Sequence, residues 1–153
     1  MPKLYVLIGV PGSGKSTWVA NQKWAADCAY ISTDNHVEEY AKSVGKTYNE
    51  VFTDYMPTAV DLMTQDVIRA REAGKDIIWD QTSTTINSRK RKFRMLPDYY
   101  AIAVVFPTPE IKELSRRLGS RPGKNIPHYV MDRMIEGFVM PSEEEGFAEI
   151  WTV

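Results

Sequence analysis

Residues Gly9-Val10-Pro11-Gly12-Ser13-Gly14-Lys15-Ser16-Thr17 decide the fold of this chain. They match the pattern G-x-x-x-x-G-K-[ST], which is called the P-loop. This pattern indicates a phosphate-binding loop where a strand precedes it and a helix follows it. An apolar run over residues 4–8 precedes the loop, and residues 15–24 are predicted to be helical. The three glycines allow backbone angles closed to other residues, so that successive N–H groups converge on one point and bind phosphate. The stretch therefore predicts a nucleoside triphosphate site.

Side chains at the end of the loop are predicted to complete that site. Lys15 would reach the β- and γ-phosphates, and the Ser16 hydroxyl would ligate Mg²⁺. ATP or another nucleoside triphosphate and Mg²⁺ are the cofactors expected, bound by Gly12, Ser13, Gly14, Lys15, Ser16 and Thr17. An ordinary glycine-rich turn is the alternative, but so many fixed positions rarely align by chance.

Length and composition predict one globular domain over residues 1–153. Hydrophobic residues make up 43% and charged residues 25% of the chain, as in ordinary soluble proteins. The single cysteine, Cys28, fits a reducing cytoplasm, and no apolar run reaches the length of a membrane span. Lys and Arg number 19 against 20 Asp and Glu, which argues against broad capture of duplex nucleic acid but allows a local basic groove. We expect a cytoplasmic protein with no membrane partner, and the sequence leaves its oligomeric state open.

Strands and helices are predicted to alternate along the chain. The predicted strands cover residues 3–8, 28–32, 76–80, 101–106 and 149–153. Predicted helices cover residues 15–24, 35–44, 86–95, 110–118 and 127–138. Thr47 and Glu50 are predicted to form a capping box at the start of a further helical stretch. A longer helix is predicted to follow, with Pro57 in its first turn and its end near Ala73. This alternation predicts an α/β fold, a P-loop-type three-layer sandwich with helices on both faces of a parallel sheet of four to five strands in the order 2-3-1-4-5.

Ligands of such sheets bind beyond the carboxyl ends of the strands, where two aspartates are expected. Asp34 follows the second strand and is the candidate general base that accepts the proton of an acceptor hydroxyl. The alternative for Asp34 is an N-cap of the next helix. Asp80 ends the third strand and would orient the waters of the metal or the acceptor, with Thr82 beside it; a turn residue is the alternative.

Two basic segments are candidates for phosphate binding. Residues 89–94 are almost entirely basic and follow the third strand, so Arg89 is a candidate ligand of an acceptor phosphate; a solvated helix face is the alternative. Residues 116–124 place Arg117 and Arg121 around Gly-Ser and Pro-Gly pairs, as expected of an arginine-rich lid that neutralises transition-state charge. We expect this lid to be mobile without nucleotide and ordered with it; a plain basic loop is the alternative.

The chain resembles the kinase domain of the phage and animal polynucleotide 5′-kinase/3′-phosphatases over nearly its whole length. The motifs are short and are partly shared with zeta-toxin-like and other small-molecule kinases; they are Gly9–Trp18, Ile31–Asp34, Ile78–Thr82, Arg117 and Arg121. The resemblance implies an ATP-dependent polynucleotide 5′-hydroxyl kinase whose partner is a DNA or RNA end. It also implies that Asp34 is the general base, that Asp80 lies at the acceptor side, and that Arg117 and Arg121 contact the donor phosphates.

Two departures from that family bear on the acceptor. The paired-aspartate signature of the phosphatase domain is missing, so 3′-end processing is not implied. Val37 stands where the family tends to place an arginine for the acceptor phosphate, and residues 89–94 are the candidate substitute. One alternative is therefore a kinase of a small hydroxylated molecule, such as a nucleoside, sugar or antibiotic, or of a hydroxylated base in DNA. Another is a nucleotide-gated binding module or ATPase, although the third strand lacks the Asp-Glu pair usual in such ATPases.

Overall fold

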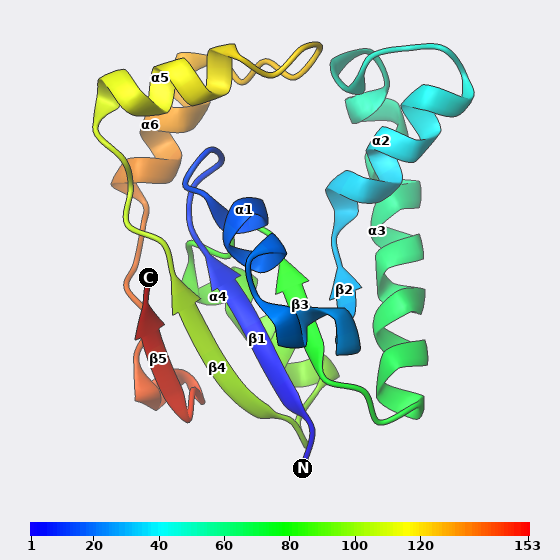
Figure 1. Ribbon diagram of the computed structural model, residues 1–153, viewed down its shortest axis with the longest axis vertical. Coiled ribbons are helices and arrows are strands. Elements are labelled where there is room, and N and C mark those ends of the chain that lie inside the picture. Colours follow the sequence, from blue (N-terminus) through cyan, green and yellow to red (C-terminus); the bar gives the residue numbers. More distant parts are fainter.

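A five-stranded parallel sheet in the order β2-β3-β1-β4-β5 forms the centre of the computed structural model, which describes residues 1–153 (Figure 1). The predicted fold class, strand order and fifth strand are confirmed. The strands are β1 (Lys3–Ile8), β2 (Ala29–Ile31), β3 (Ile77–Asp80), β4 (Tyr100–Val105) and β5 (Glu149–Thr152).

Six α-helices and two 3-10 helices connect these strands. They are α1 (Lys15–Ala20), η1 (Lys23–Asp27), α2 (Thr33–Ser43), α3 (Tyr48–Glu72), α4 (Ile86–Met95), α5 (Ile111–Gly119), α6 (His128–Glu136) and η2 (Glu143–Glu145). None of them combines the length and the apolar character that a membrane crossing needs.

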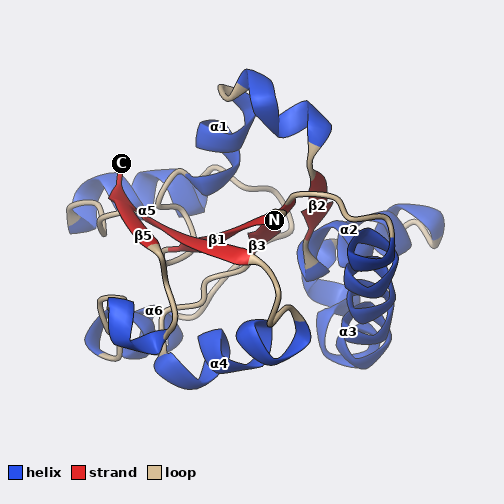
Figure 2. Cartoon of the chain, turned by 90° about the horizontal axis from the view of Figure 1, so that it is seen from below, coloured by secondary structure: helices blue, strands red, loops and turns tan.

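Each face of the sheet carries its own hydrophobic core. Alternate residues of β1 point to opposite faces, and both sets are buried, which explains why this strand is apolar throughout. Leu4, Val6 and Ile8 join a core with α3 and α4, whereas Tyr5 and Leu7 join a core with α1 and η1. Figure 2 shows the resulting layers, with α1 on one side of the sheet and α4 and α6 on the other.

Two predicted helix boundaries were wrong. Helix α1 ends at Ala20, not near Trp24, because the chain turns into η1, where Trp24 packs on Tyr5 with ring centroids 4.5 Å apart. Pro57 lies inside α3, a single 25-residue helix, and not in the first turn of a separate helix. Because proline has no N–H, the carbonyl of Thr53 lacks its helical hydrogen bond. Both Pro57 and Thr53 are exposed to solvent, so water can donate to this carbonyl instead.

Helix α2 begins two residues earlier than predicted, which changes the position of Asp34. Ser32 is the N-cap, and its Oγ accepts a hydrogen bond of 3.4 Å from the N–H of Asn35. Asp34 therefore lies within the first turn of α2, and the alternative that it caps this helix is wrong. The predicted capping box of α3 is confirmed, because Thr47 and Glu50 exchange hydrogen bonds of 2.9 and 3.2 Å.

Candidate active site

A cavity of about 1300 Å³ lies at the carboxyl ends of the strands. It is lined by the loop 11–17, by the first turns of α2 and α3, by residues 80–82 and by α5 with the segment that follows it. Typical sites for one small ligand have volumes of about 300–1000 Å³. The cavity is therefore large enough for a nucleotide and a second substrate.

The P-loop forms the floor of this cavity. Gly12 and Gly14 have φ angles of 81° and 101°, in the left-handed region that favours glycine. Gly14 caps α1, and the first-turn N–H groups of that helix donate to no backbone carbonyl, so they are available to an anion. The N–H of Gly9 donates to the carbonyl of Thr82 at 3.0 Å and thereby fastens the loop to the end of β3. Ser13 contributes through its backbone, since its hydroxyl lies against Gly9.

Lys15 lies inside the loop, and Ser16 and Thr17 follow it on the cavity wall. The Nζ atom of Lys15 donates to the carbonyls of Gly9 and Val10 at 2.8 and 2.9 Å. Burial lowers the pKa of Lys15 to about 8, although the carboxylates of Asp80 and Asp34 act in the opposite direction. The ammonium group is thus held among backbone carbonyls at the place where phosphates would lie.

Asp34 projects from α2 into the cavity and is bound by a residue of α3. The hydroxyl of Tyr48 donates to its Oδ1 at 2.6 Å, and burial together with this bond raises the pKa of Tyr48, which keeps the phenol protonated. Lys124 Nζ lies 3.9 Å from Asp34 Oδ2 and 2.5 Å from Glu38 Oε1. The side chain of Asp34 is still 54% exposed, so its second oxygen is open to a substrate.

Asp80 lies beside the strand that enters the P-loop. It pairs in register with Leu7 of β1, and it accepts a hydrogen bond from the hydroxyl of Tyr30. Burial raises the pKa of Asp80, whereas that hydrogen bond and the charge of Lys15 lower it. The proximity of Asp80 to Lys15 fits the first of its two predicted roles, which is to orient the waters of the metal, better than the second, which is to orient the acceptor.

The arginines of the predicted lid face the P-loop. Arg117, on α5, donates from Nη1 to the carbonyl of Gly12 at 3.0 Å and from Nε to Glu113 at 2.8 Å. Arg121 lines the cavity, and its Nε is buried without a hydrogen-bond partner. Buried donors are nearly always paired in proteins, so an unpartnered guanidinium N–H beside the cavity fits a residue that binds an anion. The positive charge of Arg121 lowers the pKa of both Lys15 and Tyr48.

The segment between α5 and α6 extends toward the connection between α2 and α3 (Figure 1). The side chain of Asn49 donates to the carbonyl of Asn125 and accepts from its N–H, both at 3.1 Å. The N–H of Asn49 also donates to the carbonyl of Gly123 at 2.9 Å. Gly123 has a φ of 70°, and a Cβ atom there would lie 2.8 Å from the Cβ of Thr47. The lid is thus fastened to α3, while its dependence on nucleotide stays a prediction.

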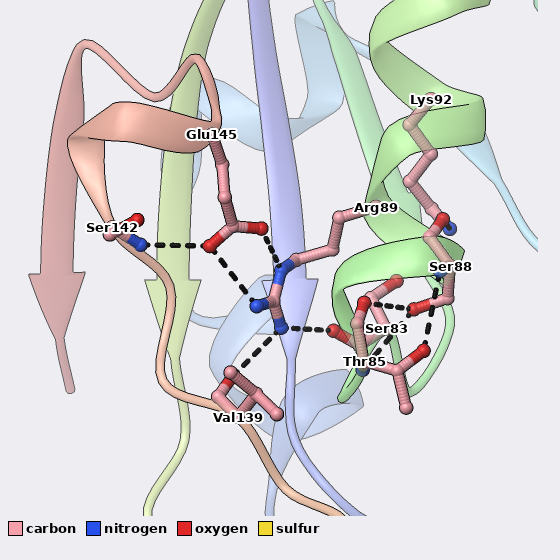
Figure 3. A network of polar contacts seen from close by, with 8 residues as sticks. All are labelled: Ser83, Thr85, Ser88, Arg89, Lys92, Val139, Ser142 and Glu145. Carbon is pink, nitrogen blue, oxygen red and sulfur yellow. Dashed lines mark hydrogen bonds and ion pairs between the residues drawn. The ribbon is translucent and has the colours of Figure 1, made fainter.

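Arg89 does not reach the cavity, contrary to the prediction that it binds an acceptor phosphate. Its side chain is fully buried and forms an ion pair of 2.7 Å with Glu145 (Figure 3). Its Nη1 donates to the carbonyls of Ser83 and Val139 at 3.0 and 2.9 Å. Arg89 therefore joins α4 to the β3–α4 loop and to the segment after α6, and its full burial keeps it from a substrate. The assignment failed because Glu145 lies 56 positions away in the sequence.

Several cavity residues were not anticipated from the sequence. They are Tyr30, Glu38, Tyr48, Asn49, Phe52 and Met56. Tyr30 carried a weak signal, since it is an aromatic residue with a polar tip in a short strand that ends at the ligand-binding edge. The α3 residues carried none, because their orientation depends on how α3 packs against α2.

The fold and the loop define a P-loop domain of the kinase type. The chain belongs to the AAA_33 family, described as an AAA domain, which matches residues 4–141. This family implies a bound nucleotide and, typically, Mg²⁺. No group of three or more His, Cys, Asp or Glu side chains forms a metal site by itself, so a metal here would depend on Ser16 and on phosphate oxygens.

Three solved structures illustrate the fold. A protein from Chloroflexus aurantiacus with a provisional kinase assignment has 18% identity and a TM-score of 0.73, over 99% of this chain and 84% of the other. A gluconokinase from Sinorhizobium meliloti 1021 has 17% identity and a TM-score of 0.58, over 99% and 82%. A chain of the Pnkp1/Rnl/Hen1 complex has 20% identity and a TM-score of 0.57, over 83% and 41%. At these identities the likeness establishes the fold and not the substrate.

Proposed function

We propose that this protein is an ATP- and Mg²⁺-dependent phosphotransferase that phosphorylates a hydroxyl group. The observation that carries the proposal is the composition of one cavity. Lys15 in the P-loop, Arg121 of the lid and the open carboxylate of Asp34 line the same space. A kinase needs all three groups, because the carboxylate across the cavity can orient an acceptor hydroxyl and accept its proton.

Each half of the cavity has a separate task in this proposal. The N–H groups at the start of α1 and Lys15 bind the β- and γ-phosphates, and Ser16 with Asp80 holds the metal and its waters. Mg²⁺ supplies neutralisation of charge on the phosphate oxygens. Arg117 and Arg121 add positive charge where negative charge spreads in the transition state, and the lid that carries Arg121 excludes water.

Asp34 serves as the base because its geometry leaves one oxygen for the acceptor. Tyr48 occupies Oδ1 and fixes the carboxylate, so Oδ2 is free to accept the proton of an acceptor hydroxyl. Phosphoryl transfer passes through a loose transition state, so the carboxylate chiefly orients the hydroxyl and takes the proton late.

Two acceptor classes remain, and different observations favour them. A polynucleotide 5′-hydroxyl end is supported by the sequence resemblance and by the structural likeness to a chain of the Pnkp1/Rnl/Hen1 complex. A small hydroxylated molecule is supported by the charges beside Asp34. Asp34 and Glu38 face Lys124 there, Arg89 is buried elsewhere, and Arg121 is assigned to the donor phosphates, so this assignment leaves no side chain to bind a phosphate of the acceptor. We favour the small acceptor.

Incubation with γ-labelled ATP and Mg²⁺ tests the proposal in three arms. One arm contains a 5′-hydroxyl oligonucleotide, one a mixture of nucleosides and sugars, and one no acceptor. Label on a nucleoside or sugar supports the favoured acceptor, and label on the oligonucleotide supports the other. Label found as free phosphate alone, at equal rates in all arms, would refute the phosphotransferase proposal.

A further inference from the structure

The first turns of α3 present an apolar stripe to the cavity. Tyr48, Phe52 and Met56 are spaced four residues apart, so they lie on one face of the helix, and all three line the cavity. Phe52 remains 40% exposed. An exposed aromatic ring inside a concave polar site is a surface on which a planar ligand can pack.

This stripe lies next to the proposed base. Tyr48 is bound to Asp34 through its hydroxyl, and the Lys124 ammonium lies 4.5 Å from the centre of its ring. The ring of Phe52 is 5.4 Å from that of Tyr48 and is the next one along the helix. A ligand that covers Phe52 can therefore place an attached hydroxyl group at Asp34.

The charges around the stripe favour an uncharged ligand. Glu38 binds the ammonium of Lys124 at 2.5 Å, and Asp34 Oδ2 lies 3.9 Å from it, so a ligand phosphate at this position would meet two carboxylates and one cation that is already paired. Asn35 is exposed on the cavity wall, and its side-chain amide makes no hydrogen bond within the chain. An amide offers a donor and an acceptor together, which suits the polar edge of a heterocycle.

We propose that the first turns of α3 form an acceptor subsite for a nucleoside unit, whose uncharged base packs on Phe52 and Met56 while a sugar hydroxyl meets Asp34. The inference rests on the proposed phosphotransferase function, and it names the acceptor of that same site. A polyol without a ring would leave the faces of Phe52 and Met56 in water. The nucleoside can be free or can be the 5′-terminal unit of a polynucleotide, since both present the same base and hydroxyl.

Equilibrium binding by calorimetry tests the subsite without depending on turnover. The protein is saturated with a non-hydrolysable ATP analogue and Mg²⁺, so that the probes cannot occupy the donor site. The probes are uridine, adenosine, sorbitol and a trinucleotide with a 5′-hydroxyl end. The variants are Phe52→Ala, Phe52→Tyr and, as a matched control, Ile68→Ala, which removes an exposed apolar side chain of α3 outside the cavity.

Nucleosides are expected to bind and sorbitol is not. Phe52→Ala is expected to weaken nucleoside binding by roughly 5- to 140-fold, the range that follows from loss of one base–aromatic contact. Phe52→Tyr retains the ring and should retain the affinity, and Ile68→Ala should not change it. Unchanged affinity for the ATP analogue shows that each variant is folded.

Each outcome bears on the proposal in a distinct way. Sorbitol binding as tightly as the nucleosides, or nucleoside affinity unchanged by Phe52→Ala, would overturn the subsite. Trinucleotide binding that depends on Phe52, without binding of free nucleosides, supports the subsite and assigns its ligand to a chain end. Nucleoside binding that depends on Phe52, with no transfer of label from ATP, retains the subsite and refutes the phosphotransferase proposal.

Discussion

Replacement of Asp34 by Asn separates chemistry from structure in this site. Asn retains an Oδ1 atom that can accept the hydrogen bond from Tyr48, but it has no charge with which to take a proton. Because Ser32 and not Asp34 caps α2, the substitution leaves the cap intact. The change therefore removes the proposed base and little else.

The structure limits the cost in stability. The pair with Lys124 spans 3.9 Å at a half-exposed side chain, and such pairs contribute about 0–1 kcal/mol. A carboxylate in the first turn of a helix contributes about 0.3–1 kcal/mol through the helix dipole. The free energy of unfolding should thus fall by roughly 1 kcal/mol, a shift of about 2–4 °C in Tm. Loss of a positioned base should lower the transfer rate by roughly 10²–10⁴-fold.

The assay compares the rate of label transfer, the Kd for an ATP analogue and the Tm of wild type, Asp34→Asn and Glu39→Gln. Glu39 is an exposed carboxylate of α2 outside the cavity, so its variant controls for loss of one negative charge. We expect nucleotide affinity close to wild type in both variants and loss of transfer in Asp34→Asn alone. A transfer rate for Asp34→Asn within about threefold of wild type, far short of the usual effect of a base, would refute the assignment.

Three further substitutions test other parts of the structure. Lys15→Ala should lower transfer by on the order of 10²-fold or more with the fold retained, as measured by turnover and circular dichroism, and wild-type turnover would contradict the P-loop assignment. Gly123→Ala should displace the lid, because the new Cβ would clash with Thr47; we expect faster hydrogen exchange over residues 119–127 and slower transfer, and unchanged exchange would contradict the lid contact. Burial lowers the pKa of Lys92 to about 8 from 10.5, so the unfolded chain binds more protons between these pH values and wild-type stability rises with pH across that window. Lys92→Met should therefore raise the free energy of unfolding by roughly 1–3 kcal/mol at pH 7, with the gain lost above about pH 10.5, and equal urea stability at pH 7 would contradict this.

The features predicted correctly from the sequence are those that short stretches specify. The glycines of the P-loop and the apolar strands on each side identify the nucleotide site and the parallel sheet without knowledge of distant contacts. Asp34 was placed correctly in the cavity because it follows a strand, and strand ends meet at one edge of a parallel sheet.

The errors concern properties that distant partners decide. The burial of Arg89 depends on Glu145, and a run of basic residues cannot reveal which of its members turns inward. Pro57 was expected in a first turn, but tertiary packing of α3 extends the helix on both sides of it. Phe52 escaped notice because its exposure to the cavity follows from the packing of α3 against α2.

An experiment in water enriched in heavy oxygen distinguishes transfer of the γ-phosphate to an alcohol from transfer to water. The protein is incubated with ATP, Mg²⁺ and a mixture of nucleosides in water enriched in the heavy isotope, and the products are analysed by mass spectrometry. We expect a phosphorylated acceptor whose phosphate contains no heavy oxygen, formed by wild type and not by Asp34→Asn. Free phosphate containing one heavy oxygen, as the only product and at the same rate in both proteins, would contradict it.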